Sequence, residues 1–528
     1  MSDEIKWFWA HRRNASLHHF SFLMHGLAGK GWKPAVNFWF DNQIVIGVPG
    51  KGCYVFYDEK QLNSKGKYKD VQESIDGNKN FVSDFRRRTD EIFGAIFFKA
   101  IAIDEANLSL LSNGELHKLY KEYIQAMMVG PIITVQLWGI EACFDENYLI
   151  MKFLRQRLSE IGKGREFQFY KEMLSVNVGE TVAFTEQKDF YRVADALDRP
   201  EIIKLFKGND DELISKKLKE HVDDNELLEK HIAKYEWVHT EYVSGGWSRE
   251  KWIGLFKEAL LADDRPKNKL EKLLEGFSEL NTERAKIIEE LKPPDDVGHA
   301  IDALSELIAQ RDWTKGYFTK LLLSHNKMLN EIAKRVGVEK EDMLNYSYKE
   351  MDDYLTGGKV LSKSELEGRK SNGYVIVIKH GKLKLVIGKK AIQELIEKEG
   401  ISEPFEKLES VSSIKGLAAS MGVVRGKARV LEDASRLSEL EDGEILVTYM
   451  TTIEFTPAFR KAGGVITDEG GMSCHAAIIS REFKLPCVVG TKIATRVLQT
   501  GDEIEVDGGA GKVKIIKSVT PTSEIETV

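Results

Sequence analysis

The sequence predicts a multidomain α+β protein, with a mainly helical N-terminal and central region and a C-terminal β/β/α domain. Two patterns indicate this class. Between about residues 80 and 335, apolar residues recur at steps of three and four, which is typical of amphipathic helices. From about residue 410 the chain becomes richer in Gly and Val, and short apolar runs alternate with turn residues, which is typical of strands. The 528 residues suffice for about three or four domains of roughly 150 residues each.

The composition excludes several classes of protein. With 30% charged and 42% hydrophobic residues, the chain is neither wholly disordered nor collagenous. The net charge of -7 leaves no basic excess, so we expect no nucleic acid and no membrane among its partners. Its 4 cysteines are scattered without a CxxC pair, so we expect neither a disulfide framework nor a metal site. The chain opens without an apolar signal segment, and a cytoplasmic location is expected.

The first predicted part is a small aromatic-rich α/β segment, residues 1–65. Two runs in it, Asn37–Val48 and Gly52–Tyr57, carry β-branched and aromatic residues. A glycine-rich loop separates them, as expected for a turn between two strands.

Residues 66–405 are predicted to form a helical domain with a short strand pair near 374–387. An apolar stripe at helical spacing runs through 270–291. Pro293-Pro294 then predicts the end of that helix, because proline cannot continue the hydrogen-bond ladder. His380-Gly381-Lys382 is the expected turn between the two strands.

Residues 410–518 are predicted to form the C-terminal β/β/α domain, and 519–528 a flexible tail. The segment Glu403–Lys415 is rich in serine and charge and is expected to act as an exposed hinge before this domain. The predicted strands are Ala428–Leu431, Glu444–Thr448, Gly464–Thr467, Cys487–Gly490, Glu503–Val506 and Val513–Ile516. Two short helices are predicted, near Thr456–Ala462 and His475–Phe483.

The strongest signal for chemistry lies where a glycine pair follows a predicted strand and a histidine opens the next helix. A helix N-terminus offers unpaired backbone N–H groups and the positive end of the helix dipole, and glycine lets backbone approach an anion closely. Neutral imidazole is also a nucleophile near pH 7. The pattern indicates His475 as the candidate catalytic residue, although spacing alone is more typical of a structural histidine than of a catalytic one. The residues predicted to support the phosphate are Gly470, Gly471, Ser473 and Cys474.

Five blocks of the C-terminal region resemble, in order, the phosphohistidine domain of the phosphoenolpyruvate-utilising enzymes. This family includes phosphoenolpyruvate synthase, pyruvate phosphate dikinase and rifampin phosphotransferase. The blocks are Gly416–Ala428, Asp442–Val447, Thr467–Glu482, Leu485–Thr491 and Gly501–Gly508. The resemblance covers about 100 residues and implies a phosphohistidine swivelling (mobile) domain in which His475 carries the phosphoryl group.

The resemblance also implies a function: phosphoryl transfer through a phosphohistidine intermediate, as in phosphoenolpyruvate synthase (pyruvate, water dikinase). The donor would be ATP or phosphoenolpyruvate with Mg²⁺ at the donor site, and the helical domain would hold a small-molecule acceptor. No P-loop is present and no ATP-grasp segment is recognisable. We therefore expect a separate ATP-grasp or phosphoenolpyruvate-binding subunit.

Two alternatives stay open. One is a non-catalytic regulatory or docking protein that retains the swivelling domain, and the other is a self-sufficient ATP-dependent kinase with a divergent nucleotide site. Ser473 has two interpretations as well. In plant-type dikinases that this block resembles, the hydroxyl residue two positions before the histidine is a regulatory phosphorylation site, whereas a simple helix cap is equally compatible with the sequence.

Overall fold

The structure, a computed structural model, divides into two compact units, each assembled from separate stretches of the chain. Unit 1 comprises Met1–Ala142, Glu241–Gly245 and Tyr317–Glu406, and unit 2 comprises Cys143–Thr240, Gly246–Gly316 and Lys407–Val528. The residues that the structure describes are 7–13, 17–19, 23, 43–48, 52–58, 73–128, 140, 143–176, 179–240, 246–379, 382–401, 411–432 and 434–519.

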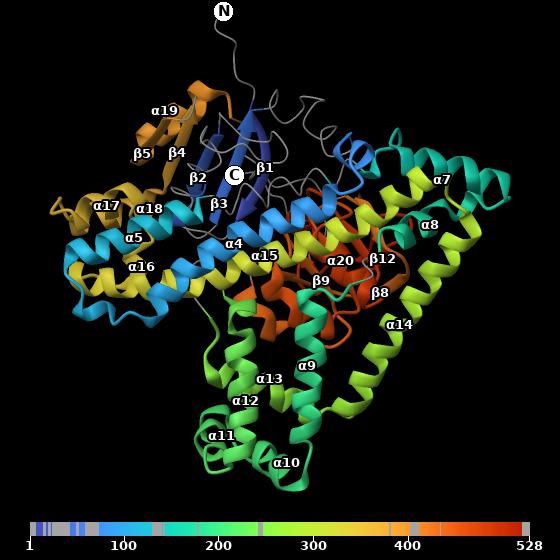
Figure 1. Cartoon of the computed structure of the whole chain (residues 1–528), viewed down its shortest axis with the longest axis horizontal. Helices are drawn as coiled ribbons and strands as arrows, with labels where there is room; N and C mark the ends of the chain where they lie inside the picture. The colour runs from blue at the N-terminus through green and yellow to red at the C-terminus, as the bar shows by residue number, and fades with distance from the viewer. Residues whose placement is uncertain are drawn as a thin grey trace, which may run out of the picture. The chain divides into compact units, whose positions relative to one another are not determined.

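Unit 1 contains a five-stranded antiparallel sheet in the order β1-β3-β2-β4-β5 (Figure 1). Its strands are β1 (Trp7–Arg13), β2 (Gln43–Val48), β3 (Gly52–Asp58), β4 (Tyr374–Lys379) and β5 (Lys382–Ile387). Both β2 and β4 are buried over five of their six residues, which explains their continuous apolar runs. Gly47 is required in β2 because a Cβ there would lie 2.4 Å from the Tyr374 ring.

Helices complete unit 1. They are α4 (Phe81–Glu105), η1 (Leu108–Leu110), α5 (Asn113–Met127), the later part of α15 (Asp295–Val336), α16 (Lys340–Met343), α17 (Tyr348–Leu355), α18 (Lys363–Asn372) and α19 (Lys389–Glu399). Capping boxes explain three of the starts, because serine and the glutamate three residues later bond each other's backbone N–H. These pairs are Ser112 with Glu115, Ser347 with Glu350, and Ser362 with Glu365.

The helical segment of unit 2 precedes its sheet in the chain. Its elements are α7 (Leu149–Glu160), η3 (Gly164–Glu166), α8 (Phe167–Leu174), α9 (Val182–Leu197), α10 (Pro200–Lys207), α11 (Asp211–Leu218), α12 (Val222–Tyr235), η4 (Glu236–His239), α13 (Arg249–Leu261), α14 (Pro266–Leu291) and the start of α15. Helices α9, α12 and α13 pack side by side (Figure 1) around a core that includes Phe190, Tyr235 and Trp252. Pro293-Pro294 separates α14 from α15, as predicted.

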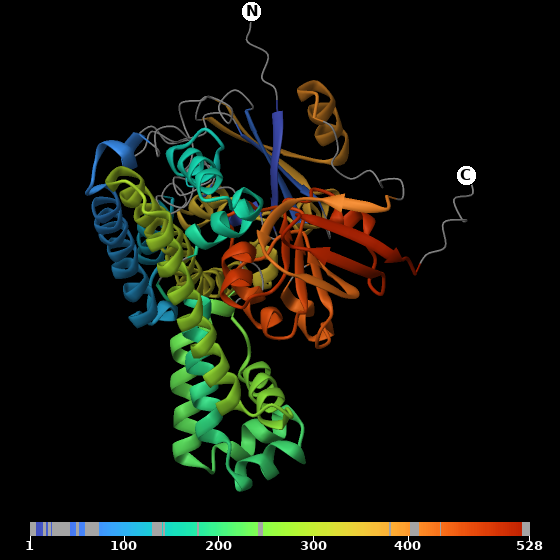
Figure 2. The same cartoon turned by 90° about the vertical axis from the view of Figure 1, so that its right-hand side faces the viewer.

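The C-terminal segment of unit 2 (residues 411–519), named the mobile segment after the predicted resemblance, forms an eight-stranded sheet in the order β6-β13-β12-β8-β9-β10-β11-β7, seen in orange and red in Figure 2. Its strands are β6 (Ser413–Lys415), β7 (Leu417–Ser420), β8 (Val423–Leu431), β9 (Ile445–Thr448), β10 (Gly464–Thr467), β11 (Cys487–Val489), β12 (Glu503–Asp507) and β13 (Lys512–Lys517). Strands β8 to β11 run parallel, and the flanking pairs are antiparallel. Its helices are η5 (Ala434–Glu439), η6 (Ile453–Arg460), α20 (His475–Glu482) and α21 (Ala494–Val497).

The predicted multidomain α+β class is confirmed, and all six strands predicted in the mobile segment are present. Five of them lie within one residue of their expected bounds, whereas β8 begins at Val423, five residues before the predicted start. Three expectations there need correction. The helix predicted at Thr456–Ala462 is a 3₁₀ helix, η6, which contains Pro457. The end of the predicted hinge, Ser413–Lys415, is strand β6, because it pairs with β13. Strand β7 was not predicted.

Other predictions fall outside the described residues. They are the first part of the hinge (403–410), the turn residues His380 and Gly381, the start of the first strand run (37–42) and most of the tail (520–528). The division into 1–65, 66–405, 410–518 and 519–528 stays a prediction. In the part of the chain that is described, no helix combines the length and apolar character needed to cross a bilayer.

Candidate functional site

The candidate site is a strand–loop–helix turn at the carboxyl edge of the parallel strands in the mobile segment. Strand β10 ends at Thr467, and α20 begins at His475, which therefore occupies the first helical position. The N-cap is Cys474, whose Sγ accepts a hydrogen bond from the Ala477 N–H at 3.5 Å. The interpretation of Ser473 as the helix cap is thus wrong.

The glycine pair before the helix has a defined structural role. Gly470 has φ +133°, a region that side-chain-bearing residues rarely adopt. A Cβ at this position would lie 2.7 Å from the Cys474 Sγ. The carbonyl of Gly471 accepts a hydrogen bond from the Cys474 N–H at 3.1 Å, which closes the turn into the helix. Only glycine at 470 therefore lets the loop fold back tightly over its own cap.

His475 is held in a defined orientation and is only 2% exposed. Its Nδ1 lies 3.0 Å from the Thr451 Oγ1, within hydrogen-bond distance. The ring of Phe459, in η6, meets the imidazole edge to face, with ring centroids 5.7 Å apart. One polar and one aromatic neighbour thus restrict how the imidazole can rotate.

Buried polar contacts fix the loop that leads to His475. Arg481 donates to the Met472 carbonyl at 2.6 Å, so helix α20 holds its own entry loop. Asp468, at the start of the loop, accepts bonds from Thr491 and Thr495, which follow β11. Burial raises the pKa of Asp468, although these hydrogen bonds oppose the rise. These hydrogen bonds therefore join the loop after β10 to the segment after β11 at the carboxyl edge of the sheet.

The helical segment of unit 2 contributes a cation to this edge. Arg311, in α15, donates from Nη1 to the Oγ of Ser473, two residues before His475. Both side chains are buried, and Ser473 has no exposed surface. A guanidinium presents several donors in a planar fork that matches phosphate oxygens. The arrangement places a permanent positive charge against the loop, at a residue two positions before His475.

Sequence reasoning found His475 and the residues around it but missed Thr451, Phe459 and Arg311. A signal for Thr451 was present, because it follows β9, which runs parallel to β10. The carboxyl ends of parallel strands lie at the same edge of a sheet, where functional residues gather. Arg311 had no comparable signal, since it lies on a helix 162 residues away.

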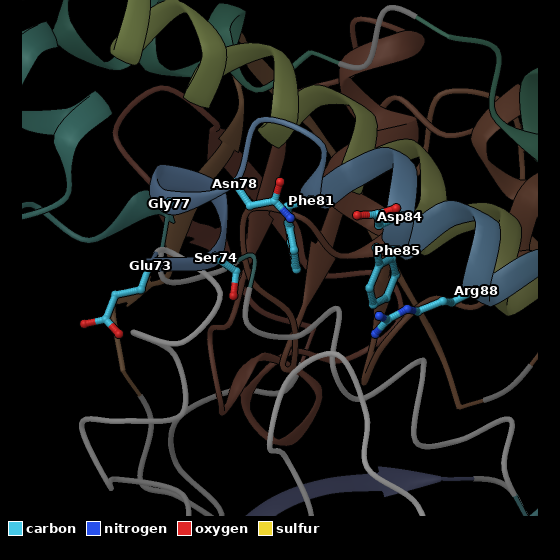
Figure 3. A pocket seen from close by; sticks show the side chains of 8 residues that line it. All are labelled: Glu73, Ser74, Gly77, Asn78, Phe81, Asp84, Phe85 and Arg88. Atoms are coloured by element: carbon cyan, nitrogen blue, oxygen red, sulfur yellow. The ribbon is translucent and has the colours of Figure 1, made fainter.

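A pocket of about 370 Å³ lies in unit 1 (Figure 3). None of the predicted site residues lines it, and its walls mix charged, polar and aromatic side chains around the start of α4. The lining residues are Glu73, Ser74, Gly77, Asn78, Phe81, Asp84, Phe85 and Arg88. Across the described ranges, no group of three or more His, Cys, Asp or Glu side chains is placed to hold a metal ion.

Comparison with known proteins identifies the mobile segment. Residues 440–511 match the family described as "PEP-utilising enzyme, mobile domain". The chain is 49% identical over 117 residues to a probable phosphoenolpyruvate synthase of Archaeoglobus fulgidus, covering 22% of this chain and 16% of that protein. It is 45% identical over 132 residues to the phosphoenolpyruvate synthase of Pyrococcus furiosus, covering 24% of this chain and 16% of that protein. An uncharacterised phosphotransferase of Bacillus subtilis, YvkC, is 45% identical over 103 residues, covering 20% of this chain and 12% of that protein.

The predicted resemblance to the phosphoenolpyruvate-utilising enzymes is therefore confirmed for the C-terminal region, which contains His475 and the loop before it. The matches are confined to a small share of each relative, 16% of the Archaeoglobus fulgidus protein for example. They identify this domain as belonging to a phosphoryl-transfer family.

Proposed function

We propose that the protein transfers phosphoryl groups through a phosphohistidine formed on His475, in the manner of phosphoenolpyruvate synthase. The observation that carries the proposal is the position of His475. It opens a helix after a tight glycine turn, and Thr451 and Phe459 restrict its ring. The positive end of the helix dipole at the start of α20 favours the negative charge that a phosphoryl group brings.

The geometry favours Nε2 as the atom that carries the group. When Nδ1–H donates to the Thr451 Oγ1, the lone pair of the neutral imidazole lies on Nε2. In loading, this pair forms the N–P bond while the bond between phosphorus and the donor's leaving oxygen breaks. In delivery, an acceptor oxygen attacks phosphorus, the N–P bond breaks, and its electron pair returns to Nε2. Restricting the ring keeps one nitrogen aligned for both steps.

Arg311 supports delivery in the arrangement that the structure describes. Its guanidinium reaches the loop of the carrier from the helical segment, so a phosphoryl group on His475 would meet a fixed positive charge there. Charge that is already in place lowers the barrier to phosphoryl transfer without reorganisation. We accordingly assign the acceptor, a small molecule, to the helical segment of unit 2.

The loading reaction stays a prediction from the sequence. The donor is ATP or phosphoenolpyruvate, bound with Mg²⁺ by a separate ATP-grasp or phosphoenolpyruvate-binding subunit. Magnesium bound with the donor would neutralise part of the charge on the phosphoryl group that is transferred. Gly470, Gly471, Ser473 and Cys474 would support the phosphate on the carrier by shaping the turn around it.

The test is the chemical identity of the phosphorylated residue. Full-length protein is isolated from expressing cells under alkaline conditions, or incubated with Mg²⁺ and either labelled ATP or labelled phosphoenolpyruvate, and the modified peptide is sequenced by mass spectrometry. We expect an acid-labile, alkali-stable phosphate on His475 that is absent from His475→Ala. His221→Ala is the matched control, since His221 precedes α12 in the helical segment. Label that persists in His475→Ala would refute the assignment.

A further inference from the structure

Several further side-chain contacts join the mobile and helical segments of unit 2, and one of them is a buried ion pair that lies apart from the Arg311 contact. Arg460, the last residue of η6 in the mobile segment, reaches into the helical segment and contacts α9. Its Nη2 lies 2.6 Å from the Oε2 of Glu186, whose side chain is fully buried. The Arg460 side chain is itself only 8% exposed. A charge pair this deeply buried is costly to separate, because each charge would be left without its partner.

Aromatic side chains line the rest of the pocket that receives Arg460. Its guanidinium carbon lies 4.3 Å from the ring centroid of Phe190 and 6.0 Å from that of Tyr191, both in α9. His231, in α12, lies on the other side of the carboxylate, with its Nε2 3.7 Å from the Glu186 Oε1. The pocket therefore offers a planar cation both a carboxylate and π faces, a combination that suits arginine better than lysine.

The position of Arg460 in the chain connects this pocket to the carrier histidine. The preceding residue, Phe459, is the aromatic neighbour of His475. Consecutive residues of η6 thus touch the carrier on one side and enter the helical segment on the other. Movement of Arg460 out of its pocket would shift the backbone that holds Phe459 against the imidazole.

We propose that Arg460 is a positioning residue: seated between Glu186 and the α9 aromatic rings, it anchors the mobile segment on the helical segment and thereby sets the place of His475. The proposal rests on the proposed function for its significance, because an anchored carrier is one held for delivery. Arg460 touches no reacting atom. Its departure from the pocket is one of the steps that the carrier needs before it can move towards a donor, because contacts such as that between Thr181 and Glu482 must break as well.

The experiment measures how readily His475 reacts with diethylpyrocarbonate in the unphosphorylated full-length protein. Modification of each histidine is followed by peptide mass spectrometry. In Arg460→Met and in Glu186→Gln, we expect His475 to react at least about tenfold faster than in the wild type, equivalent to ~1.4 kcal/mol of docking free energy. Arg460→Lys keeps the charge but loses the planar fork, so its rate should fall between those of wild type and Arg460→Met.

Arg425→Met is the matched control, because Arg425 pairs with Glu505 inside the mobile segment on an exposed strand. His117 and His221 serve as reference histidines within each sample. Unchanged His475 rates in both Arg460→Met and Glu186→Gln would overturn the proposal. It would also be overturned if the reference histidines accelerated as much as His475, since the effect would then be general unfolding. No phosphoryl group is needed for this readout, so the outcome is independent of whether His475 is ever phosphorylated.

Discussion

Replacement of Gly470 by alanine tests whether the turn before His475 demands glycine. The substitution adds one methyl group, and two separable costs follow from its position. The backbone at φ +133° is strained for any residue with a Cβ, and the new atom would lie 2.7 Å from the Cys474 Sγ. Such a distance is far inside van der Waals contact, so either the cap or the loop must shift.

The cost of backbone strain and the cost of steric crowding can be assigned separately. Backbone strain of this kind costs about 1–3 kcal/mol, and overpacking a closed site costs about 1–3 kcal/mol more. Gly470→Ala should therefore destabilise the loop and α20 by ~2–6 kcal/mol. Two control substitutions separate the costs. Gly443 has φ +82° and no heavy atom within 4 Å of an added Cβ, so Gly443→Ala measures backbone strain alone. Gly464 has no positive φ, but an added Cβ would lie 2.8 Å from the Val424 side chain, so Gly464→Ala measures steric crowding.

The measurement is amide hydrogen exchange of the full chain, read on peptides that cover β10 and α20. Cys474→Ala removes the clashing sulfur. The double variant Gly470→Ala/Cys474→Ala should therefore be destabilised by about 1–3 kcal/mol less than the sum of the destabilisations of the two single variants. The single Cys474→Ala variant supplies the cost of the lost cap, ~1 kcal/mol. Strictly additive costs in this double-mutant cycle would refute the steric reasoning.

Two further predictions concern pH. Burial lowers the pKa of His325 to about 3, and burial likewise lowers those of His18 and His19, so all three are neutral when folded and take up protons on unfolding below about pH 6.5. The free energy of unfolding of unit 1 should thus fall by up to ~2 kcal/mol per histidine between pH 6.5 and 5. In urea unfolding measured across this range, His325→Phe should make the free energy of unfolding depend less steeply on pH. An unchanged dependence would contradict this. Burial raises the pKa of Glu172, in α8, to about 7, although the Arg481 charge and the hydrogen bond from the Met421 N–H oppose the rise. The contact of α8 with the mobile segment is therefore favoured at low pH, where Glu172 is protonated, and weakens as the pH rises from about 4.5 through 7. Glu172→Gln should lack this trend, so the ratio of mutant to wild-type exchange rates at the Met421 amide should fall as the pH rises, and a ratio independent of pH would show the reasoning to be wrong.

Features encoded within a short stretch of sequence could be predicted, and those formed by distant segments could not. The turn that contains Gly470 and His475 lies within a few consecutive residues. The candidate roles of these two residues could therefore be predicted from their spacing and from the resemblance of the block to a known family. The strands of the mobile segment were predicted because each is a short apolar run between turn residues. Five of the six agree with their predicted bounds within one residue, whereas β8 begins five residues early, because its pairing with β12 extends back to Val423.

The contacts of Arg311 and Arg460 show the limit of that reasoning. Arg311 lies 162 residues from Ser473, and Glu186 lies 274 residues from Arg460. Neither arginine differs from other charged positions on a helix until the tertiary fold brings its partner close. Helical periodicity does place Glu186 on the same buried face as Phe190. A buried carboxylate there requires a partner, but periodicity cannot say which cation supplies it.

The sheet of unit 1 has a consequence for synthesis of the chain. Strand β2 ends at Val48 and its neighbour β4 begins at Tyr374, so about 325 residues separate them. At a translation rate of about 5–20 residues per second, β2 emerges from the ribosome roughly 15–65 s before β4 exists. During that interval the nascent hairpin of β2 and β3 presents an open, apolar edge, the kind of surface that aggregates or recruits chaperones. We therefore expect the yield of folded protein to depend on elongation speed, and on chaperones that shield nascent chains, more than its final stability would suggest.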